Sequence, residues 1–338
     1  MYRGTHVTDL RKIRQWNWYR PTFGDFRESV DHGDFVPLMV IPGHCRVISH
    51  VVCFKHEFNT PIKEHPMLTI EQAADIPERV YRSKGGCLTQ EQVEFYDREG
   101  YLVLDRYLTE AELEPAREAM TEKVNRIATE LLRDGLIIDR LEREPFKYRL
   151  AKLFKGMTDT QFLKYGRSWR DRLPGYYTLM SNPKIIDAVE SLIGGEIFAN
   201  PVYNVRPKVP GVAAGAVPWH QDRSYWPDAN SNPVITVWIP LVDTTHENGC
   251  LHVWPRTHQT RVMNYHADTY TGTGYTEIDD DQMRQLKRKA VALPVPAGSA
   301  ILFNDRNVHS STPNNSDHVR WSVDLRYQPT DQDPMSVY

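Results

Sequence analysis

The chain has 338 residues, 40% of them hydrophobic and 25% charged, with a formal net charge of −3. This length gives room for one large domain or two smaller ones, and the composition is that of a globular protein. The charge balance gives no reason to expect nucleic acid or a membrane surface as partner, and no apolar run approaches the roughly 18 residues of a membrane-spanning helix. We therefore expect no nucleic acid and no membrane as partner, and the sequence does not indicate an oligomeric state.

The cysteines and the first residues bear on the compartment. The four cysteines are scattered, which argues against a disulfide framework or a zinc ribbon. The N-terminus contains no apolar segment typical of a secretory signal. We therefore expect a cytoplasmic protein with reduced thiols. Histidines and cysteines crowd residues 44–56, but their spacing matches no metal motif, so a metal there is disfavoured.

Residues 1–86 contain aromatic side chains among charges and prolines, without a sustained helical or strand period. A disordered tail is usually poorer in aromatics. We therefore predict an ordered N-terminal extension that packs on a core domain of residues 87–338.

Helix signals begin at the start of this core domain. Capping boxes at 89–92 and 109–112 predict two helices, because a threonine and a Gln or Glu three residues later satisfy each other's free backbone N–H groups. A strand is predicted between them at 101–104. Apolar spacing predicts further helices at 154–163 and 185–192.

After Gly195 the pattern changes to short strands separated by turns. Helices followed by many short strands favour a mainly β fold with flanking α-helices, in the form of an antiparallel barrel or a double-sheet jelly roll. The predicted strands are 197–205, 234–242, 250–254, 291–293, 300–304 and 319–328.

Three residues have the character of an iron(II) site. His220 and Asp222 are separated by one residue, so on a strand both side chains face the same side. His309 follows the predicted strand at 300–304 and reaches the same place in a rolled sheet. Two neutral imidazoles and one carboxylate leave three positions open on an octahedral iron, whereas a structural zinc site is closed by four protein ligands.

Arg320 completes such a site if the co-substrate is a dicarboxylate. Fe²⁺ with one carboxylate ligand leaves a positive site, and a 2-oxoglutarate dianion makes it negative, so one buried cation restores the balance. A guanidinium binds a carboxylate through two parallel hydrogen bonds. The strand predicted at 319–328 alternates apolar residues with Arg320, Ser322, Asp324 and Arg326, which fits a polar barrel interior.

Two other classes of function compete with an iron oxygenase. A His-x-Asp pair alone is a weak motif, and it also fits a zinc-dependent hydrolase or a non-catalytic β-barrel binding protein. A hydrolase has no use for Arg320. A silent binding protein has no reason to keep His220, Asp222, His309 and Arg320 together.

From about Leu88 to Pro329 the chain resembles the phytanoyl-CoA dioxygenase (PhyH) family of Fe(II)/2-oxoglutarate oxygenases, whose core is a double-stranded β-helix of the jelly-roll or cupin-like kind. Each motif is weak alone, and their combination and order carry the resemblance. The motifs are 88–92 with 100–104, 208–210, 218–222, 237–243, 247–251, 255–258, 296–299 and 309–320.

The resemblance implies the roles of single residues. His220, Asp222 and His309 would bind Fe(II), and Arg320 would hold the distal carboxylate of 2-oxoglutarate. Further contacts to 2-oxoglutarate would come from Gln221, Trp238, Ser311 and Ser322. One motif departs from the family, which commonly has Pro-Gly-Ser-His where this chain has Pro-Arg-Thr-His at 255–258. This departure puts the local turn in question.

The resemblance also implies the reaction. With O₂ and 2-oxoglutarate as co-substrates, the enzyme would oxidise an unactivated C–H bond of a small molecule, in what we expect to be secondary metabolism. Hydroxylation is the simplest outcome, and oxidative N-dealkylation or desaturation are possible on the same site. Family halogenases replace the carboxylate ligand with a small residue, so Asp222 argues for oxygen chemistry.

Substrate contacts are predicted only in outline. Arg223, Tyr225 and Trp226 follow the ligand pair and are candidates to line the mouth. Residues 264–275 have the aromatic and glycine content of a lid, although an ordinary surface loop is an equal interpretation. Arg223 with Lys208 is a candidate pair for an acidic group of the substrate.

Overall fold

A computed structural model describes residues 86–330, except 167–172, 213–214, 226–233 and 269–274. The chain divides into two units, Met1–Pro37 and Leu38–Tyr338, and all described residues belong to the second. The predicted N-terminal extension, the His/Cys-rich segment 44–56 and Trp226 lie outside the described residues, so those expectations stay predictions.

The helices are α1 (Gln90–Glu99), α2 (Glu110–Arg133), α3 (Phe146–Leu153), α4 (Asp159–Gly166), α5 (Pro174–Met180), α6 (Pro183–Ile193) and α7 (Asp280–Met283). Helices α1 and α2 begin at the two predicted capping boxes, and α6 covers the helix predicted at 185–192, whereas α5 and α7 were not predicted. Both capping boxes form, with Thr89 and Thr109 each accepting from the backbone N–H three residues later and that residue's side chain accepting in return.

The single helix predicted at 154–163 is wrong. The chain forms α3 and α4 instead, and the break between them contains Gly156 with a φ of 80°. This left-handed conformation suits glycine and cannot continue a helix. The first helix therefore ends earlier and the second ends later than the apolar spacing indicated.

The strands form two main antiparallel sheets, as a jelly roll requires. The major sheet has the order β1-β9-β4-β11-β2, the minor sheet has the order β3-β10-β5-β8, and β6 pairs with β7. The strands are β1 (Tyr101–Leu104), β2 (Ile197–Lys208), β3 (Val217–His220), β4 (Ile235–Pro240), β5 (Leu251–Val253), β6 (Tyr265–Ala267), β7 (Thr276–Ile278), β8 (Val291–Leu293), β9 (Ala300–Asn304), β10 (His309–Ser311) and β11 (Arg320–Pro329). The predicted fold class is confirmed, although β3, β6, β7 and β10 were not predicted as strands.

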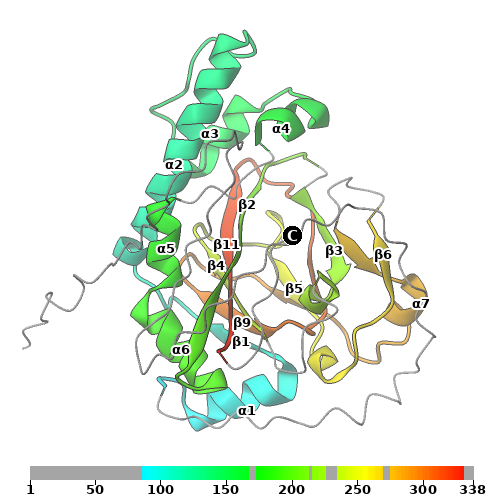
Figure 1. Cartoon of the computed structure of the whole chain (residues 1–338). Coiled ribbons are helices and arrows are strands. Elements are labelled where there is room, and N and C mark those ends of the chain that lie inside the picture. The colour runs from blue at the N-terminus through cyan, green and yellow to red at the C-terminus, as the bar shows by residue number, and fades with distance from the viewer. Residues whose placement is uncertain (1–85, 167–172, 213–214, 226–233, 269–274, 331–338) are drawn as a thin grey trace, which may run out of the picture. The chain divides into compact units, whose positions relative to one another are not determined.

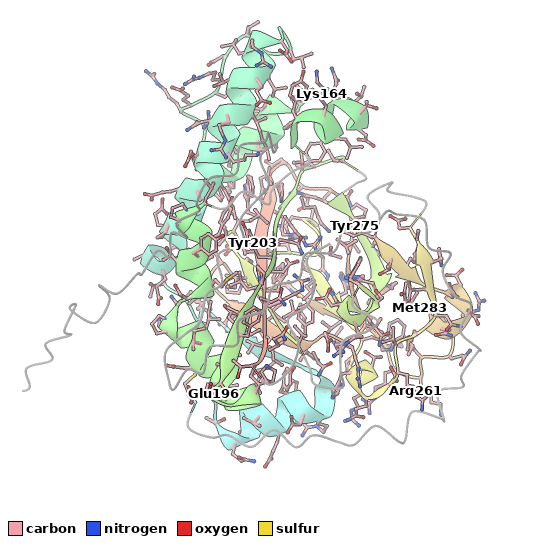
Figure 2. The ribbon with its side chains drawn as sticks, in the orientation of Figure 1. Lys164, Glu196, Tyr203, Arg261, Tyr275 and Met283 are labelled. Carbon is pink, nitrogen blue, oxygen red and sulfur yellow. The ribbon has the colours of Figure 1, made fainter. Side chains whose placement is uncertain are left out.

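Helices α2, α5 and α6 lie along one face of the major sheet, and the minor sheet lies on its other side (Figure 1). The helix-facing side is apolar: Trp321, Val323 and Leu325 of β11 belong to one buried cluster with residues of these helices. Tyr203 of β2, labelled in Figure 2, packs its ring against Tyr176 with centroids 5.9 Å apart. This packing fixes the major sheet and turns the alternate side chains of β11 towards the minor sheet.

The space between the two sheets has its own smaller apolar cluster, to which Trp238, Leu251 and Phe303 belong. The polar residues of β11 lie beside it and are all buried, including Arg320 and Arg326. This confirms the alternation predicted for that strand. Among the described residues, no helix is both long and apolar enough to cross a membrane.

Candidate active site

His220, Asp222 and His309 meet where β3 pairs with β10. His220 ends β3, His309 begins β10, and the two residues are direct partners across the strands. One carboxylate oxygen of Asp222, Oδ1, lies 3.6 Å from His220 Nε2 and 3.8 Å from His309 Nε2. All three side chains are buried.

The expectation that His220 and Asp222 share one strand face is wrong. The strand stops at His220, and Asp222 begins a short 3-10 helix, η4 (Asp222–Tyr225). The turn is closed by Ser224, whose backbone N–H and hydroxyl both donate to the Gln221 carbonyl, at 3.0 and 2.7 Å. The turn, rather than strand alternation, brings the carboxylate to the imidazoles.

Each imidazole is oriented by its own backbone. His220 Nδ1 lies 2.9 Å from the Pro218 carbonyl oxygen, and His309 Nδ1 lies 2.9 Å from the Asn307 carbonyl oxygen. A carbonyl only accepts, so each Nδ1 carries the proton and each Nε2 keeps its lone pair. Metal-binding histidines are commonly held in this way. Both free Nε2 atoms face Asp222.

Asp222 is held as a carboxylate by its second oxygen. Oδ2 accepts from Thr236 Oγ1 at 2.8 Å and from Arg326 Nη2 at 3.0 Å. Burial alone would raise the pKa of Asp222, but the charge of Arg326 and the two imidazoles hold that pKa well below its usual value. Oδ1 is therefore left as a charged donor atom beside the two Nε2 atoms.

The charge state of His309 completes the donor set. Burial, followed by the neighbouring His220, lowers the pKa of His309 to about 3, so its imidazole is neutral near pH 7. Two neutral imidazoles and one carboxylate on one side of a site are the ligands of a mononuclear non-haem Fe(II) centre with open positions. The side chains present therefore fit Fe(II).

A cavity opens beside the three candidate metal-binding residues. His220 and His309 line one part of it, and Arg320 lines another. Its wall is otherwise formed by Arg206, Val217, Trp238, Leu251, Phe303, Ser310, Ser311, Asp324 and Arg326.

Arg320 is a buried cation without a carboxylate partner in the described part of the chain. Its Nη1 donates to Ser322 Oγ at 2.5 Å, and its guanidinium lies 5.5 Å from the centre of the Trp238 ring. Burial lowers the pKa of Arg320 to about 10, so it is charged at neutral pH. A buried charge needs an ionic partner, and a carboxylate entering the cavity would supply one. Because Arg320 lines the same cavity as His220 and His309, the cavity suits a ligand that carries a carboxylate.

Lys208 is the cross-strand neighbour of Arg320. The two residues lie on β2 and β11, and Lys208 Nζ donates to Ser311 Oγ at 2.7 Å and to the Thr312 carbonyl at 2.5 Å. A Cβ at Gly249 would lie 3.0 Å from the lysine stem and 2.3 Å from the Thr312 carbonyl oxygen, so this glycine leaves room for Lys208. Burial and the charge of Arg320 hold the pKa of Lys208 well below its usual value.

Comparison with known proteins gives the family. The profile of the family described as phytanoyl-CoA dioxygenase (PhyH) matches residues 96–322, which is most of the chain. The chain belongs to this family. It is therefore a non-haem iron dioxygenase that uses Fe(II) and 2-oxoglutarate, and neither the zinc hydrolase nor the silent binding protein is favoured.

Individual relatives are distant. The peroxisomal phytanoyl-CoA dioxygenase of Homo sapiens is 23% identical over 78% of this chain and 75% of its own length. The phytanoyl-CoA dioxygenase domain-containing protein 1 homolog of Dictyostelium discoideum is 26% identical over 71% of this chain and 91% of its own length. The crystal structure of EctD from S. alaskensis with 2-oxoglutarate and 5-hydroxyectoine superposes with a TM-score of 0.52 at 19% identity, covering 78% of this chain and 85% of that one.

The PhyH-family residues predicted to contact 2-oxoglutarate fall into two groups. Trp238 and Ser311 line the cavity, and Ser322 accepts from Arg320. Gln221 is buried but does not line the cavity. Its Nε2 donates to the Arg306 carbonyl at 2.7 Å and its Oε1 accepts from the Met263 N–H at 2.8 Å, so both ends of the amide hold neighbouring loops.

The predicted substrate residues are likewise separated. Arg223 is buried against Asp305, with Nε 2.5 Å from Oδ2, so it does not form a pair with Lys208. The ring of Tyr225 lies 6.0 Å from that of His220, and its hydroxyl accepts from the Thr276 N–H at 3.1 Å. Of the predicted lid, residues 265–267 form β6, and 269–274 lie outside the described residues.

Sequence reasoning missed Thr236 and Arg326, the two residues that hold Asp222. Strand alternation places Arg326 on the correct face, but nothing in the sequence links it or Thr236 to Asp222. A second pair also lies on the cavity wall: Arg206 Nε donates to Asp324 Oδ2 at 2.8 Å, and Arg206 Nη1 donates to the Tyr275 hydroxyl at 2.9 Å. Tyr275 is labelled in Figure 2.

The turn at 255–258 forms although its sequence, Pro-Arg-Thr-His, differs from the Pro-Gly-Ser-His common in the family. Arg256 has a φ of 69°, in the left-handed region that suits the family's glycine. Its side chain pairs with Glu99 at 2.8 Å, and its backbone N–H donates to the Glu99 carbonyl. Thr257 Oγ1 donates to the Trp254 carbonyl and accepts from the Val308 N–H, at 2.7 and 2.8 Å, next to His309.

Proposed function

We propose that this enzyme hydroxylates an unactivated C–H bond of a small molecule, with His220, Asp222 and His309 as the Fe(II) ligands and Arg320 as the anchor of 2-oxoglutarate. The observation that supports this most is that one cavity is lined by two free Nε2 atoms and by a buried guanidinium without a carboxylate partner among the described residues. A two-ended co-substrate explains both features.

When bound, iron with 2-oxoglutarate and O₂ supplies the oxidising chemistry, and 2-oxoglutarate leaves as succinate and CO₂. The protein's own residues position these groups. Arg326 and Thr236 hold Asp222 in one rotamer, with Oδ1 beside the imidazoles. The backbone carbonyls hold both imidazoles in the ligand tautomer. Such preorganisation is the protein's main contribution in cofactor enzymes.

The anchor for the distal carboxylate has several parts. Arg320 offers the charge, and Ser322 and Trp238 restrict its guanidinium. We further propose that Ser311, which accepts from Lys208, presents its hydroxyl to the same carboxylate. Lys208 would then act through Ser311 rather than by direct contact.

The finer features of the function are the reaction type, the substrate class and the compartment. We propose hydroxylation over halogenation because the carboxylate ligand Asp222 is present, and N-dealkylation or desaturation would use the same site. The human relative is named for phytanoyl-CoA, but the described cavity wall of this chain carries Arg206, Asp324 and Arg326, which favours a small polar substrate. We propose a cytoplasmic enzyme of secondary metabolism.

The decisive experiment measures iron and 2-oxoglutarate binding without turnover. Under anaerobic conditions, Fe(II) and 2-oxoglutarate together are expected to produce the weak visible charge-transfer band of the chelate. Asp222→Ala should lose this band and the succinate formed under air, because one donor atom is removed. Asp317→Ala, which removes an exposed carboxylate, is the matched control and should behave as the parent.

Two results would contradict the proposal. One is Asp222→Ala with full succinate formation, which would reject the ligand assignment. The other is the parent protein without a chelate band at saturating Fe(II) and 2-oxoglutarate. Succinate formation in the presence of candidate small molecules then identifies the substrate.

A further inference from the structure

A second group of metal-ligating side chains lies outside the iron site. One ligand atom from each of His246, Cys250 and His252 lies within 4.8 Å of the other two. His252 is on β5, and the other two residues belong to the turn before it. The strand alternates, so His252 points away from the face on which Leu251 lines the cavity. The group is therefore separate from the three ligands described above.

The turn that carries His246 and Cys250 is held by its own hydrogen bonds. The Thr245 N–H donates to Asn248 Oδ1 at 2.8 Å, the Asn248 N–H donates to Thr245 Oγ1 at 3.2 Å, and the Cys250 N–H donates to the Thr245 carbonyl at 2.9 Å. Asn248 Nδ2 also donates to the Asp243 carbonyl at 2.9 Å. The closeness of the imidazole and the thiol is thus a property of a fixed turn.

His252 is oriented as the two iron-site histidines are. Its Nδ1 lies 3.2 Å from the carbonyl oxygen of Cys250, two residues earlier, so Nδ1 carries the proton and Nε2 keeps its lone pair. His220 and His309 are held in the same way, since each Nδ1 contacts the carbonyl oxygen of the residue two positions earlier. Burial, followed by the charges of His246 and Lys208, lowers the pKa of His252, which keeps it neutral.

Cys250 is a free, buried thiol. Burial raises its pKa, while the charges of Arg320 and Lys208 act in the opposite direction. A bound divalent ion would remove the thiol proton, as coordination does for thiols in general. Two imidazoles and a thiolate are softer ligands than the imidazoles and carboxylate of the iron site, and they select zinc over magnesium or calcium.

We propose that His246, Cys250 and His252 bind a soft divalent metal ion, zinc in the first place, at a site distinct from the iron centre. Three protein ligands leave the fourth tetrahedral position for water, on the side where His246 is exposed. The ion fastens the 244–250 turn to β5. That strand pairs with β10, which carries His309 and Ser311, so the second metal stabilises the wall of the active site.

Cobalt(II) is the probe, because thiolate-bound cobalt gives an intense near-ultraviolet charge-transfer band that a His/His/Asp site cannot give. Titration of the reduced, metal-free full chain should show this band rise to a plateau, to which the His/His/Asp site does not contribute even when it also takes up cobalt. Cys250→Ser should abolish it, and His246→Ala should weaken cobalt binding at least tenfold. His246 is exposed on a turn, so its replacement leaves folding intact. Zinc should displace the cobalt and erase the band.

The control addresses two of the three other thiols, Cys45 and Cys53, which lie in the His/Cys-rich segment 44–56. A Cys45→Ser/Cys53→Ser double variant should keep the band, because it leaves the proposed site unchanged. The proposal is overturned if the parent shows no thiolate band at saturating cobalt, if the band survives Cys250→Ser, if the double variant loses it, or if His246→Ala binds cobalt as the parent does. Asp222→Ala should keep the thiolate band while it loses iron binding, which separates this test from that of the proposed function.

Discussion

The two sheets contribute different halves of the candidate site by different means. His220 and His309 lie at the ends of β3 and β10, which have four and three residues, whereas Arg320 begins the ten-residue β11, paired on both sides with β2 and β4. A long strand inside a sheet fixes the direction of its side chains by alternation alone. The ends of short strands do not, and here backbone carbonyls and a neighbouring arginine orient the ligands.

Arg326 connects the two halves, because it lies on β11 and its guanidinium holds Asp222. In Arg326→Leu the buried carboxylate loses its cation, so the Asp222 pKa rises. Breaking a buried ion pair costs roughly 3–5 kcal/mol, and loss of such a supporting contact typically weakens metal binding by roughly 10–100-fold. Urea unfolding and anaerobic Fe(II) titration measure the two effects.

Two further variants make the Arg326 result specific. Arg326→Lys keeps the charge and should recover part of the iron affinity. Arg284→Leu removes an exposed arginine and should change neither measurement. If Arg326→Leu binds iron as tightly as the parent, the ligand half of the site does not depend on β11.

Arg320→Met tests the part of the site that is proposed to hold the distal carboxylate of 2-oxoglutarate. This substitution removes the positive charge and retains much of the side-chain length. Charge-assisted hydrogen bonds contribute roughly 1.5–3 kcal/mol each, so the Kd for 2-oxoglutarate should rise by roughly 100-fold or more. Iron affinity should change little, because the Arg320 guanidinium lies against Ser322 and Trp238 and not against the three proposed ligands. Titration of the anaerobic chelate band gives both values. Equal losses of iron and 2-oxoglutarate affinity would show that the two halves are not separable.

The same contrast explains what the sequence could predict. Alternation of polar and apolar residues over 319–328 is enough to place Arg320, Ser322 and Arg326 on one polar face. The spacing of His220, Asp222 and His309 indicates a shared site, but the strand-face explanation is wrong, because Asp222 lies in η4 and not on a strand. Contacts such as Arg326 with Asp222 join positions far apart in the chain, and no local pattern encodes them.

The remaining gaps also have physical causes. Apolar spacing cannot locate the break between α3 and α4, since it depends on the left-handed Gly156. Lys208 gave only a weak signal, because a lysine is usually exposed and its burial depends on the close approach of Gly249. Gln221 follows a ligand in the sequence, yet the turn directs its amide to neighbouring loops.

Lowering the pH should reduce the stability of the metal-free fold, because His309 is held neutral in the folded protein. Its pKa in the folded, metal-free protein is about 3, below the ordinary value of about 6.5. Below pH 6.5 the unfolded chain therefore binds a proton that the folded chain does not, and stability falls as the pH decreases from about 6.5 towards 3, by roughly 1.4 kcal/mol per pH unit. Asp222, whose pKa is also lowered, adds a loss in the same direction only below its ordinary pKa, near pH 4.

The measurement is urea unfolding of metal-free protein at pH 6.5 and pH 5. We expect a loss of roughly 1.6 kcal/mol attributable to His309 over this interval, because half of the unfolded imidazole is already protonated at pH 6.5. His309→Gln cannot take up the proton, so it should show a smaller loss over the same interval. An identical pH dependence in the two proteins would mean that His309 is not held neutral by burial.

The smallest expected effect concerns the turn after β5, where Arg256 occupies the left-handed conformation. Two contributions to stability oppose each other at Arg256. The left-handed conformation disfavours any side chain. The arginine side chain, however, pairs with Glu99, and this contact is the largest cause of the lowered Glu99 pKa. Arg256→Ala keeps the strained conformation and loses the pair, whereas Arg256→Gly loses the pair and removes the strain. Arg256→Gly should therefore melt a few degrees above Arg256→Ala. Equal melting temperatures would show that the turn relaxes in the alanine variant. The glycine common in the family would then not be required to place Thr257 beside the strand that carries His309.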